Sequence, residues 1–332
     1  MKKKNIVTIG GGTGSFVLLS GLKKYPVNIA AIISMSDDGG STGRLRDELG
    51  VLPPGDVRQC LVALSESSEE MRNLMNYRFE NGGLEGHSFG NILLSALEKI
   101  NGSFSRGVEE ASRILSVTGE VIPVTEDDAK LCMELKNGKK LKGEHNITNN
   151  LSIEKIGVKK YCIFPKVKAN PKAIEKIKRA DVVIIGPGNH YSSVLPNLLV
   201  GGIPEAVLNS RAKVIYNCNM VNKKGQTEKF SLDDYVEAVN MILGGERINC
   251  VTYSTSKPSG KLLNKYNRKG EVLVEFSKNS RKKRSYEIVK ANLLNYTVPI
   301  YSKNDAIAST RSFIRHDSDK LAKVLMKIIK DK

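Results

Sequence analysis

Short, continuously apolar runs alternate along this chain with helix-length amphipathic stretches. Residues 5–9 and 27–34 are the first two apolar runs, and each leads into a glycine-rich stretch. A strand that helices cover on both faces is apolar on both sides, so such runs are typical of parallel sheets. The sequence therefore predicts a doubly wound, mostly parallel Rossmann-like α/β sheet. The further predicted strands are 181–185, 213–216, 249–253 and 272–276, and the predicted helices are 16–24, 57–66, 89–100, 108–117, 171–179, 232–243 and 317–329.

A hairpin signal interrupts this alternation. Asn137-Gly138 separates two short runs at 131–135 and 139–141. Because Asn-Gly is the preferred pair in tight β-hairpin turns, we expect a small antiparallel excursion around residues 130–165. The 332 residues are enough for one large α/β domain or two smaller ones.

The net charge of +17 points, taken alone, to an anionic partner such as nucleic acid. Nearly half of this charge lies in residues 257–284, which hold ten Lys and Arg against two Glu. Aromatic residues make up only 6% of the chain, and no Trp is present for base stacking. Since no known nucleic-acid-binding motif accompanies the charge, nucleic acid is not expected as a partner.

The five cysteines show no CxxC or zinc spacing, so the sequence predicts no disulfide framework. The apolar run that follows the basic N-terminus ends at Gly10, which is too short for a signal peptide. No run approaches the ~20 apolar residues of a membrane helix. We therefore expect a cytoplasmic protein without a membrane partner.

A glycine-rich segment follows the first predicted strand. It contains Gly11, Gly12, Thr13 and Gly14 and stands directly before a predicted helix. Glycines let backbone amides approach a ligand, and a helix N-terminus favours negative charge, so this segment suits a phosphate. It matches neither the Walker A loop nor GxGxxG. The alternative is a tight strand-to-helix turn without a ligand.

A second loop, residues 36–46, follows the second predicted strand. Arg44 could hold a phosphate directly, whereas Asp37 and Asp38 could hold a divalent ion or hydrogen-bond a ribose. The alternative is a polar surface loop capped by its own aspartates.

Two shorter motifs are less specific. Asp56, in Pro53-Pro54-Gly55-Asp56, is predicted to be a helix N-cap or a ligand-facing carboxylate. His87 and Asn91 are one helical turn apart at a helix start, so both could face one ligand. A single histidine is more often structural, and no carboxylate or cysteine stands at metal spacing from it.

A third strand-to-helix loop contains Gly186, Gly188 and Asn189, and Asn219 follows the next predicted strand. The carboxyl ends of parallel strands meet at one edge of a sheet, so these loops are expected to line a common crevice. Several polar loops at one edge indicate a small ligand with phosphate groups. No Ser-His-Asp order, nucleophile elbow or kinase signature is present.

These motifs, in this order, resemble those of the YvcK/CofD-like family. The similar strings are TIGGGTGSFVLLSGLK (8–23), SDDGGSTGRLR (36–46), PPGDVRQCLVALS (53–65), HSFGN (87–91), GPGNHYSSVLPNLL (186–199), YNCNMVNKKGQTEKFSLDDYVEAV (216–239) and RHDSDKLAKVL (315–325). The resemblance covers nearly the whole chain. It implies a single CofD-like α/β domain over residues 1–332, in which 257–332 is a candidate C-terminal lobe beside the ligand crevice.

The family has two branches. One contains the phospholactate transferase, which moves a phospholactyl-type group from a guanylylated donor onto a deazaflavin precursor with magnesium. The other contains the bacterial gluconeogenesis factor, a cytoplasmic protein implicated in cell shape and associated with nucleotide-sugar binding. The loops at 36–46, 53–58 and 87–91 resemble the second branch. The resemblance thus implies a UDP-sugar-binding regulator needed for morphogenesis during gluconeogenic growth, with a transferase as the alternative; whether any turnover occurs stays open.

The resemblance also assigns roles to residues. The deazaflavin-contacting Asp of the family falls on Asp56, and Tyr266 and Arg315 match positions linked with ligand binding. We expect the glycine segments at 11–14 and 186–188 to cradle a diphosphate, Tyr266 to stack on a base and Arg315 to pair with phosphate. In the transferase alternative, Asp56 or Asp38 orients the acceptor, and magnesium, the one cofactor expected, lies on Asp38. Neither flavin nor haem is expected, and a homo-oligomer, with a dimer favoured, is expected.

Overall fold

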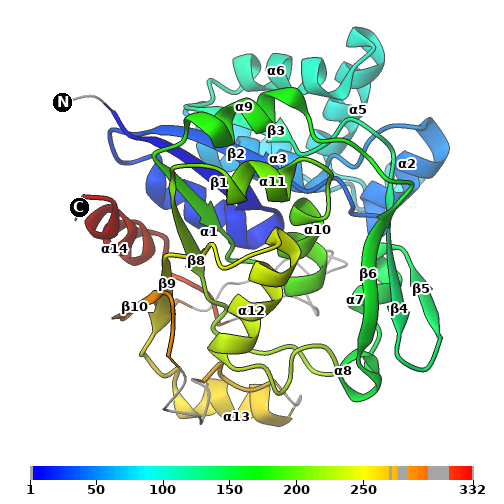
Figure 1. Cartoon of the computed structure of the whole chain (residues 1–332). Coiled ribbons are helices and arrows are strands. Elements are labelled where there is room, and N and C mark those ends of the chain that lie inside the picture. The colour runs from blue at the N-terminus through cyan, green and yellow to red at the C-terminus, as the bar shows by residue number, and fades with distance from the viewer. Residues whose placement is uncertain (1–2, 269–270, 276–282, 298–313, 331–332) are drawn as a thin grey trace.

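A seven-stranded sheet in which all paired strands run parallel forms the centre of the molecule (Figure 1). The computed structural model describes residues 3–268, 271–275, 283–297 and 314–330. The strand order is β10-β9-β8-β7-β1-β2-β3. The predicted doubly wound sheet is confirmed. Its strands are β1 (Asn5–Gly10), β2 (Asn28–Ile33), β3 (Glu120–Pro123), β7 (Val182–Ile185), β8 (Lys213–Asn217), β9 (Cys250–Ser254) and β10 (Glu287–Ala291).

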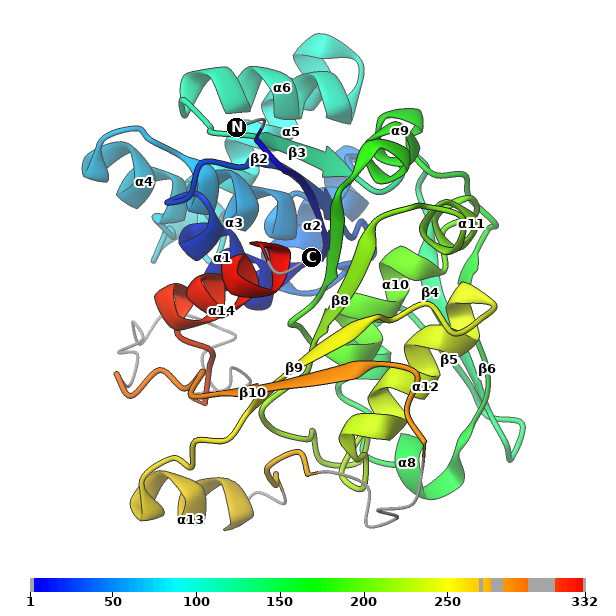
Figure 2. The ribbon, with the colours of Figure 1, turned by 60° about the vertical axis from the view of Figure 1, so that its left-hand side comes forward.

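Helices cover both faces of this sheet, which is why the central strands are apolar throughout (Figure 2). On one face α1 (Gly12–Leu22) packs against α3 (Gly55–Leu64) and α14 (Ser318–Lys330). On the other, α11 (Ile203–Leu208) packs against α9 (Pro171–Arg179) and α12 (Leu232–Leu243). The other helices are α2 (Gly40–Leu49), α4 (Glu69–Asn76), α5 (Phe89–Asn101), α6 (Phe104–Ile114), α7 (Glu144–Thr148), α8 (Ile153–Ile156), α10 (Leu195–Leu198), α13 (Gly260–Arg268), the 3-10 turn η1 (Gly82–Leu84) and the π-helical turn η2 (His190–Val194).

The order of the strands creates a switch point between β1 and β7. From β1 the chain builds outward through β2 to β3, and from β7 it builds in the opposite direction to β10. The segments that follow β1 and β7 therefore diverge to opposite faces, and the gap between them at the carboxyl ends is where ligands bind in open α/β sheets. Both predicted glycine segments lie at this gap.

A small antiparallel sheet stands at one side of the main one (Figure 1). It has the order β5-β4-β6, with strands β4 (Lys130–Leu135), β5 (Lys140–Lys142) and β6 (Val158–Phe164). The hairpin predicted at Asn137-Gly138 joins β4 to β5, and α7 follows β5. The predicted antiparallel excursion is confirmed.

Three expectations about local structure are wrong. Residues 272–276 were expected to be a strand, but the described part makes only single bridges, Val221 to Leu273 and Ser231 to Glu275; Phe276 lies outside the described residues. The place beside β9 is taken by β10 instead. Helix α1 begins at Gly12 rather than at residue 16, and α2 occupies most of the expected loop at 36–46.

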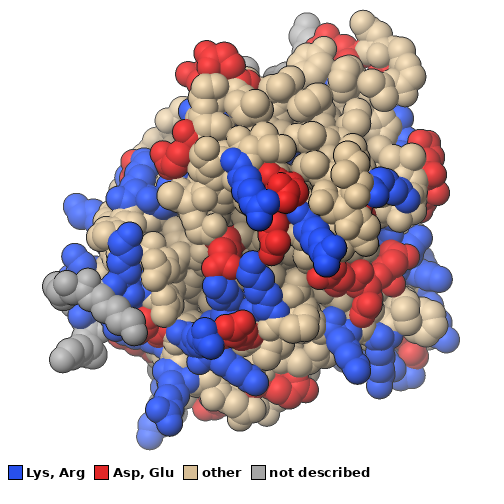
Figure 3. All heavy atoms as spheres, turned by 90° about the horizontal axis from the view of Figure 1, so that it is seen from above, with Lys and Arg blue, Asp and Glu red and all other residues tan. Residues whose placement is uncertain are grey.

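Charged side chains of both signs are interspersed on the face shown in Figure 3. On α9, for example, Lys172 pairs with both Glu109 and Glu120, at 3.1 and 3.2 Å. The net positive charge is therefore not gathered into one patch on this face. Within the described ranges, no helix combines the length and the apolar character needed to cross a membrane.

Candidate functional site

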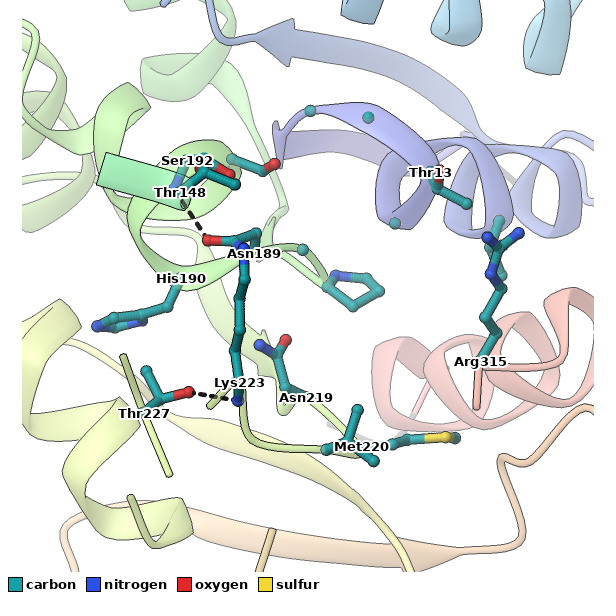
Figure 4. Close-up of a pocket in the computed structure, with 18 of the residues that line it drawn as sticks. Thr13, Thr148, Asn189, His190, Ser192, Asn219, Met220, Lys223, Thr227 and Arg315 are labelled. Carbon is teal, nitrogen blue, oxygen red and sulfur yellow. Dashed lines mark hydrogen bonds between the residues drawn. The ribbon is translucent and has the colours of Figure 1, made fainter. Parts of the chain in front are cut away.

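A pocket of about 400 Å³ lies at the switch point of the main sheet (Figure 4). Its walls come from the start of α1, the loops after β7 and β8, the N-terminal turns of α3 and α7, and residues 314–316. This volume is in the range of small-molecule sites. Ten of the residues expected from the sequence line it: Gly11, Gly12, Thr13, Gly14, Asp37, Asp56, Gly188, Asn189, Asn219 and Arg315.

The start of α1 and the loop after β7 meet at the floor of the pocket. Gly12 has φ +60°, a conformation that favours glycine, and this lets the helix begin directly behind β1. A Cβ atom on Gly14 would overlap the carbonyl oxygen of Pro187, so only glycine allows this approach. The first turn of an α-helix leaves its N–H groups without intrahelical acceptors. The pocket is thus bordered by backbone donors and by the positive end of a helix.

Buried amide side chains hold the loop after β7 in place. The Asn217 side chain donates to the carbonyl of Gly186 at 3.0 Å, and that of Asn197 donates to the carbonyl of Gly10 at 3.1 Å. The Oδ1 atom of Asn189 accepts from the N–H groups of Tyr191 and Ser192, both at 3.1 Å, and so starts η2. Gly186 itself supports the loop but does not line the pocket.

Two cationic side chains, Lys223 and Arg315, lie on different sides of the pocket (Figure 4). Arg315 lies beside α1 near Thr13, whereas Lys223 lies next to Asn189. Burial lowers the pKa of Lys223, and the carboxylate of Glu144 opposes this shift. Both residues provide charge-assisted donors of the kind that bind phosphate.

Four carboxyl groups line the pocket. Three of them interact electrostatically and form its acidic side, Asp37, Asp56 and Glu144, and the fourth is Glu271. Burial and then the charges of Asp37 and Glu144 raise the pKa of Asp56 to about 8, against a hydrogen bond from the Gly12 N–H that lowers it. Burial also raises the pKa of Asp37 and of Glu144. Like charges held this close retain a proton near neutral pH or attract a cation, which is a typical property of functional sites.

A magnesium ion would have to use this acidic side. In the described part of the chain, no group of three or more His, Cys, Asp or Glu side chains could hold a metal ion alone. Magnesium, however, is usually held by one or two carboxylates together with water and phosphate oxygens, and Asp37 and Asp56 suit that arrangement.

Asp38, the residue expected to hold the metal, lies outside this pocket lining. Its carboxylate accepts the N–H groups of Glu144 and His145 at 3.1 and 2.8 Å, and thus caps α7.

Arg44, His87 and Asn91 are also absent from the pocket lining. Arg44 is exposed and donates to the carbonyl of Glu85 at 2.7 Å. The Nδ1 atom of His87 lies 3.0 Å from the Ser41 hydroxyl. Asn91 accepts a hydrogen bond from the Arg58 guanidinium at 3.0 Å. The His87 and Asn91 contacts join α2, α3 and α5, so these two side chains serve packing between helices.

Tyr266, which the family resemblance implied to stack on a base, does not line the pocket either. Its side chain is only 3% exposed, and its hydroxyl accepts the N–H of Ile314 at 3.2 Å. Asp56 is not the N-cap of α3, because Pro54 takes that place and Asp56 lies in the first helical turn.

The sequence reasoning missed three charged residues of the pocket: Glu144, Lys223 and Glu271. Glu144 belongs to α7, which has five residues and is too short to show a helical pattern. Lys223 lies inside the family-like string 216–239, and that string was the signal that could have identified it. Further lining residues not expected from the sequence include Gln59, Thr148, His190, Ser192, Ser193, Asn222, Gln226, Thr227 and His316.

Comparison with known proteins places this architecture in a family. A family model described as 2-phospho-L-lactate transferase CofD matches residues 6–294. The gluconeogenesis factor of Bacillus subtilis strain 168 is 36% identical over 332 residues, covering 99% of each chain. That of Halalkalibacterium halodurans is 48% identical over 243 residues, covering 72% of this chain and 74% of its own. A crystal structure of a UPF0052 family member from Bacillus halodurans has a TM-score of 0.87 at 37% identity, covering 98% of this chain and 99% of that one. The chain therefore belongs to the YvcK/CofD-like family, and relatives similar to it over nearly their whole length are named gluconeogenesis factors.

Proposed function

We propose that this chain is a gluconeogenesis factor that binds a nucleotide diphosphate sugar of the UDP-sugar type. The observation that carries the proposal is the convergence of a helix N-terminus and two cations on one pocket at the switch point of the sheet. Phosphate groups favour helix N-termini and clustered backbone donors. Arg315 and Lys223 supply additional positive charge, which favours a diphosphate over a neutral ligand.

The acidic side suits the hydroxyl-bearing parts of such a ligand. Asp37 and Asp56 face the same pocket as Arg315, and carboxyl groups bind sugar hydroxyls through short hydrogen bonds. The pocket volume of about 400 Å³ fits a ligand that is partly covered and partly open to solvent. We infer an orientation in which the phosphates lie at the N-terminus of α1 between Arg315 and Lys223, and the hydroxyl groups face Asp37 and Asp56.

The proposed biological role is regulatory. Binding of a nucleotide sugar would report the supply of envelope precursors, so that cell shape is maintained during growth on gluconeogenic carbon sources. The names of the relatives support the link to gluconeogenesis. The link to nucleotide sugars rests on the resemblance to the gluconeogenesis-factor branch and on the groups of the pocket that suit phosphate and hydroxyls.

Titration calorimetry with UDP-sugars tests the binding proposal. We expect saturable binding to the wild type and a loss of at least about tenfold in affinity for Arg315→Ala, since a charge-assisted hydrogen bond contributes about 1.5–3 kcal/mol. Arg44→Ala is the matched control, because Arg44 is exposed and outside the pocket lining. No saturable binding, or equal losses for the two variants, would contradict the proposal.

A transferase of phosphorus-containing groups is the second candidate, favoured by the pKa of about 8 at Asp56. A carboxyl with a pKa near the working pH can hold or release the proton of an acceptor hydroxyl. Magnesium, when bound by Asp37 or Asp56, would screen the charge of a diphosphate donor.

Incubation with a guanylylated donor and a deazaflavin acceptor tests this alternative. Product that forms with the wild type and is lost in Asp56→Asn would favour the enzyme. Absence of product while UDP-sugars bind would favour the regulator.

A further inference from the structure

Two of the five cysteines lie directly opposite each other in the small sheet. Cys132 on β4 is the register partner of Cys162 on β6. On the other side of β4, the carbonyl of Leu131 accepts the Gly143 N–H at 2.8 Å, and the Leu135 N–H donates to the Lys139 carbonyl at 2.9 Å. Along a strand, the N–H and C=O groups of successive residues point alternately to the two neighbouring strands. Since the Leu131 carbonyl and the Leu135 N–H point away from β6, the N–H and C=O groups of Cys132 point towards β6.

This pattern fixes the distance between the two cysteines. Opposite residues of the hydrogen-bonded type in an antiparallel pair have Cα atoms about 5.5 Å apart. A disulfide needs a Cα separation of roughly 4.4–6.8 Å. The backbone of the small sheet therefore already provides the spacing that a disulfide between Cys132 and Cys162 requires.

Both side chains lie on the half-exposed face of the small sheet. Leu131 and Met133, their neighbours on β4, are buried, and side chains alternate between the faces of a strand. Burial and then the adjacent Cys162 thiol raise the pKa of Cys132, which shows that the two thiols are within electrostatic range. The other three thiols are buried in the main core: Cys60, Cys218 and Cys250.

We propose that Cys132 and Cys162 form a reversible disulfide by exchange with a low-molecular-weight disulfide such as glutathione disulfide. The thiolate of one cysteine attacks a glutathione sulfur and releases one glutathione thiolate. The thiolate of the second cysteine then attacks the protein sulfur of the mixed disulfide, forms the cross-strand bond and releases the second glutathione. Two protein thiols are oxidised, one glutathione disulfide is reduced, and the two protons end on the glutathione thiols.

The cross-link would join two strands that hold parts of the pocket wall. From β4 the chain leads through β5 to α7, which carries Glu144 and Thr148 into the pocket. Next to Cys162 on β6, the Tyr161 hydroxyl donates to the carbonyl of Tyr191 in η2. The cysteines themselves are on the opposite face of the sheet from Tyr161, so an oxidant reaches them without entering the pocket. This inference does not depend on the identity of the pocket's ligand.

The test uses the full chain at low concentration in buffers with rising ratios of oxidised to reduced glutathione. After rapid alkylation, intact mass spectrometry should show a monomer with two fewer alkylated thiols and, before alkylation, a mass about 2 Da below that of the reduced chain. Reductant should reverse both changes. Peptide mapping of the wild type should recover a cross-link between the peptides that carry Cys132 and Cys162.

Cys132→Ser and Cys162→Ser should each abolish the cross-linked species and leave a mixed disulfide with glutathione. Because both side chains are half-exposed, the circular dichroism spectrum of each variant should match that of the wild type. The proposal is overturned if all accessible thiols stay alkylatable in the oxidising buffers, if mapping finds another pair, or if the product is a disulfide-linked dimer.

Discussion

The carboxyl groups and the cations of the pocket differ in how they are arranged. The two cations, Lys223 and Arg315, lie on different sides of the pocket, Arg315 beside α1 near Thr13 and Lys223 next to Asn189. Asp37, Asp56 and Glu144, by contrast, lie close enough to interact: burial raises the pKa of each, the charges of Asp37 and Glu144 further raise that of Asp56, and the charge of Asp37 raises that of Glu144. A cluster of buried like charges costs stability, and chains keep such clusters where binding or chemistry needs them. On the proposed function, the difference means that the acidic side is kept for the hydroxyl groups of a ligand, whereas the two cations and the N-terminus of α1 decide where its phosphates lie.

The largest expected effect on ligand affinity comes from removing the charge of Lys223, one of the two cations of the pocket. Lys223→Met keeps most of the aliphatic chain but removes the ammonium group. We expect UDP-sugar affinity to fall about 10- to 100-fold, as for other hydrogen bonds to charged groups. Lys224→Met is the control, because Lys224 is the exposed neighbour outside the pocket lining. If calorimetry gives equal affinities for both variants, the ammonium group of Lys223 does not bind the phosphates of the ligand.

The next prediction concerns Asp56, on the acidic side of the pocket, and the pH dependence of the free energy of unfolding. Since the pKa of Asp56 is raised to about 8 from an ordinary value of 3.8, the folded state holds more protons than the unfolded state between about pH 4 and 8. The free energy of unfolding therefore falls as pH rises through this range. In Asp56→Asn this dependence should weaken, and at pH 8.5 the variant should be more stable by several kcal/mol, because the pKa of Asp56 is raised from 3.8 to about 8 and one pKa unit is worth about 1.4 kcal/mol.

Urea unfolding at pH 4.5, 6.5 and 8.5 measures this prediction. The two proteins should have similar stability at the lowest pH and diverge as the pH rises. Curves that stay parallel across the range would mean that Asp56 is not under electrostatic strain in the fold.

A smaller effect separates Asp38 from its neighbour Asp37. Because Asp38 caps α7 through two N–H groups, Asp38→Ala should lower the free energy of unfolding by about 1 kcal/mol. Asp38→Asn keeps one of the two acceptor oxygens and should lose less stability than Asp38→Ala. Both variants should bind UDP-sugars within about twofold of wild type, since Asp38 is outside the pocket lining. A large loss of affinity in Asp38→Asn would show that Asp38 takes part in ligand binding together with the acidic side of the pocket.

Local sequence patterns predicted the central part of the fold well. The continuously apolar runs became β1, β2, β7 and β8, because only buried parallel strands bury such runs on both faces. Helices α9 and α12 begin and end where their amphipathic patterns do. The prediction at 272–276 failed because a short apolar run also suits an extended segment lying against two loops. The start of α1 was predicted too late because its first turn contains glycines, which have a low helix propensity.

The site was predictable where it follows the ends of strands and not where it depends on tertiary contacts. The segments after β1 and β7 must meet at the switch point, so Gly12, Gly14 and Gly188 were accessible to reasoning from the sequence. His87 precedes the N-cap of α5 and Asn91 lies in its first turn, and their spacing in the sequence does not say what either side chain contacts. Similarly, the pairing of Cys132 with Cys162 follows only from the register of β4 and β6.

A crystal structure of the chain with a bound UDP-sugar tests the central claim most directly. The account predicts density for a diphosphate at the N-terminus of α1, within hydrogen-bonding distance of Arg315 and of backbone N–H groups at Thr13, Gly14 or Gly188, with the sugar or ribose hydroxyls towards Asp37 and Asp56. A diphosphate bound away from α1 and Arg315, or outside the pocket, would contradict it.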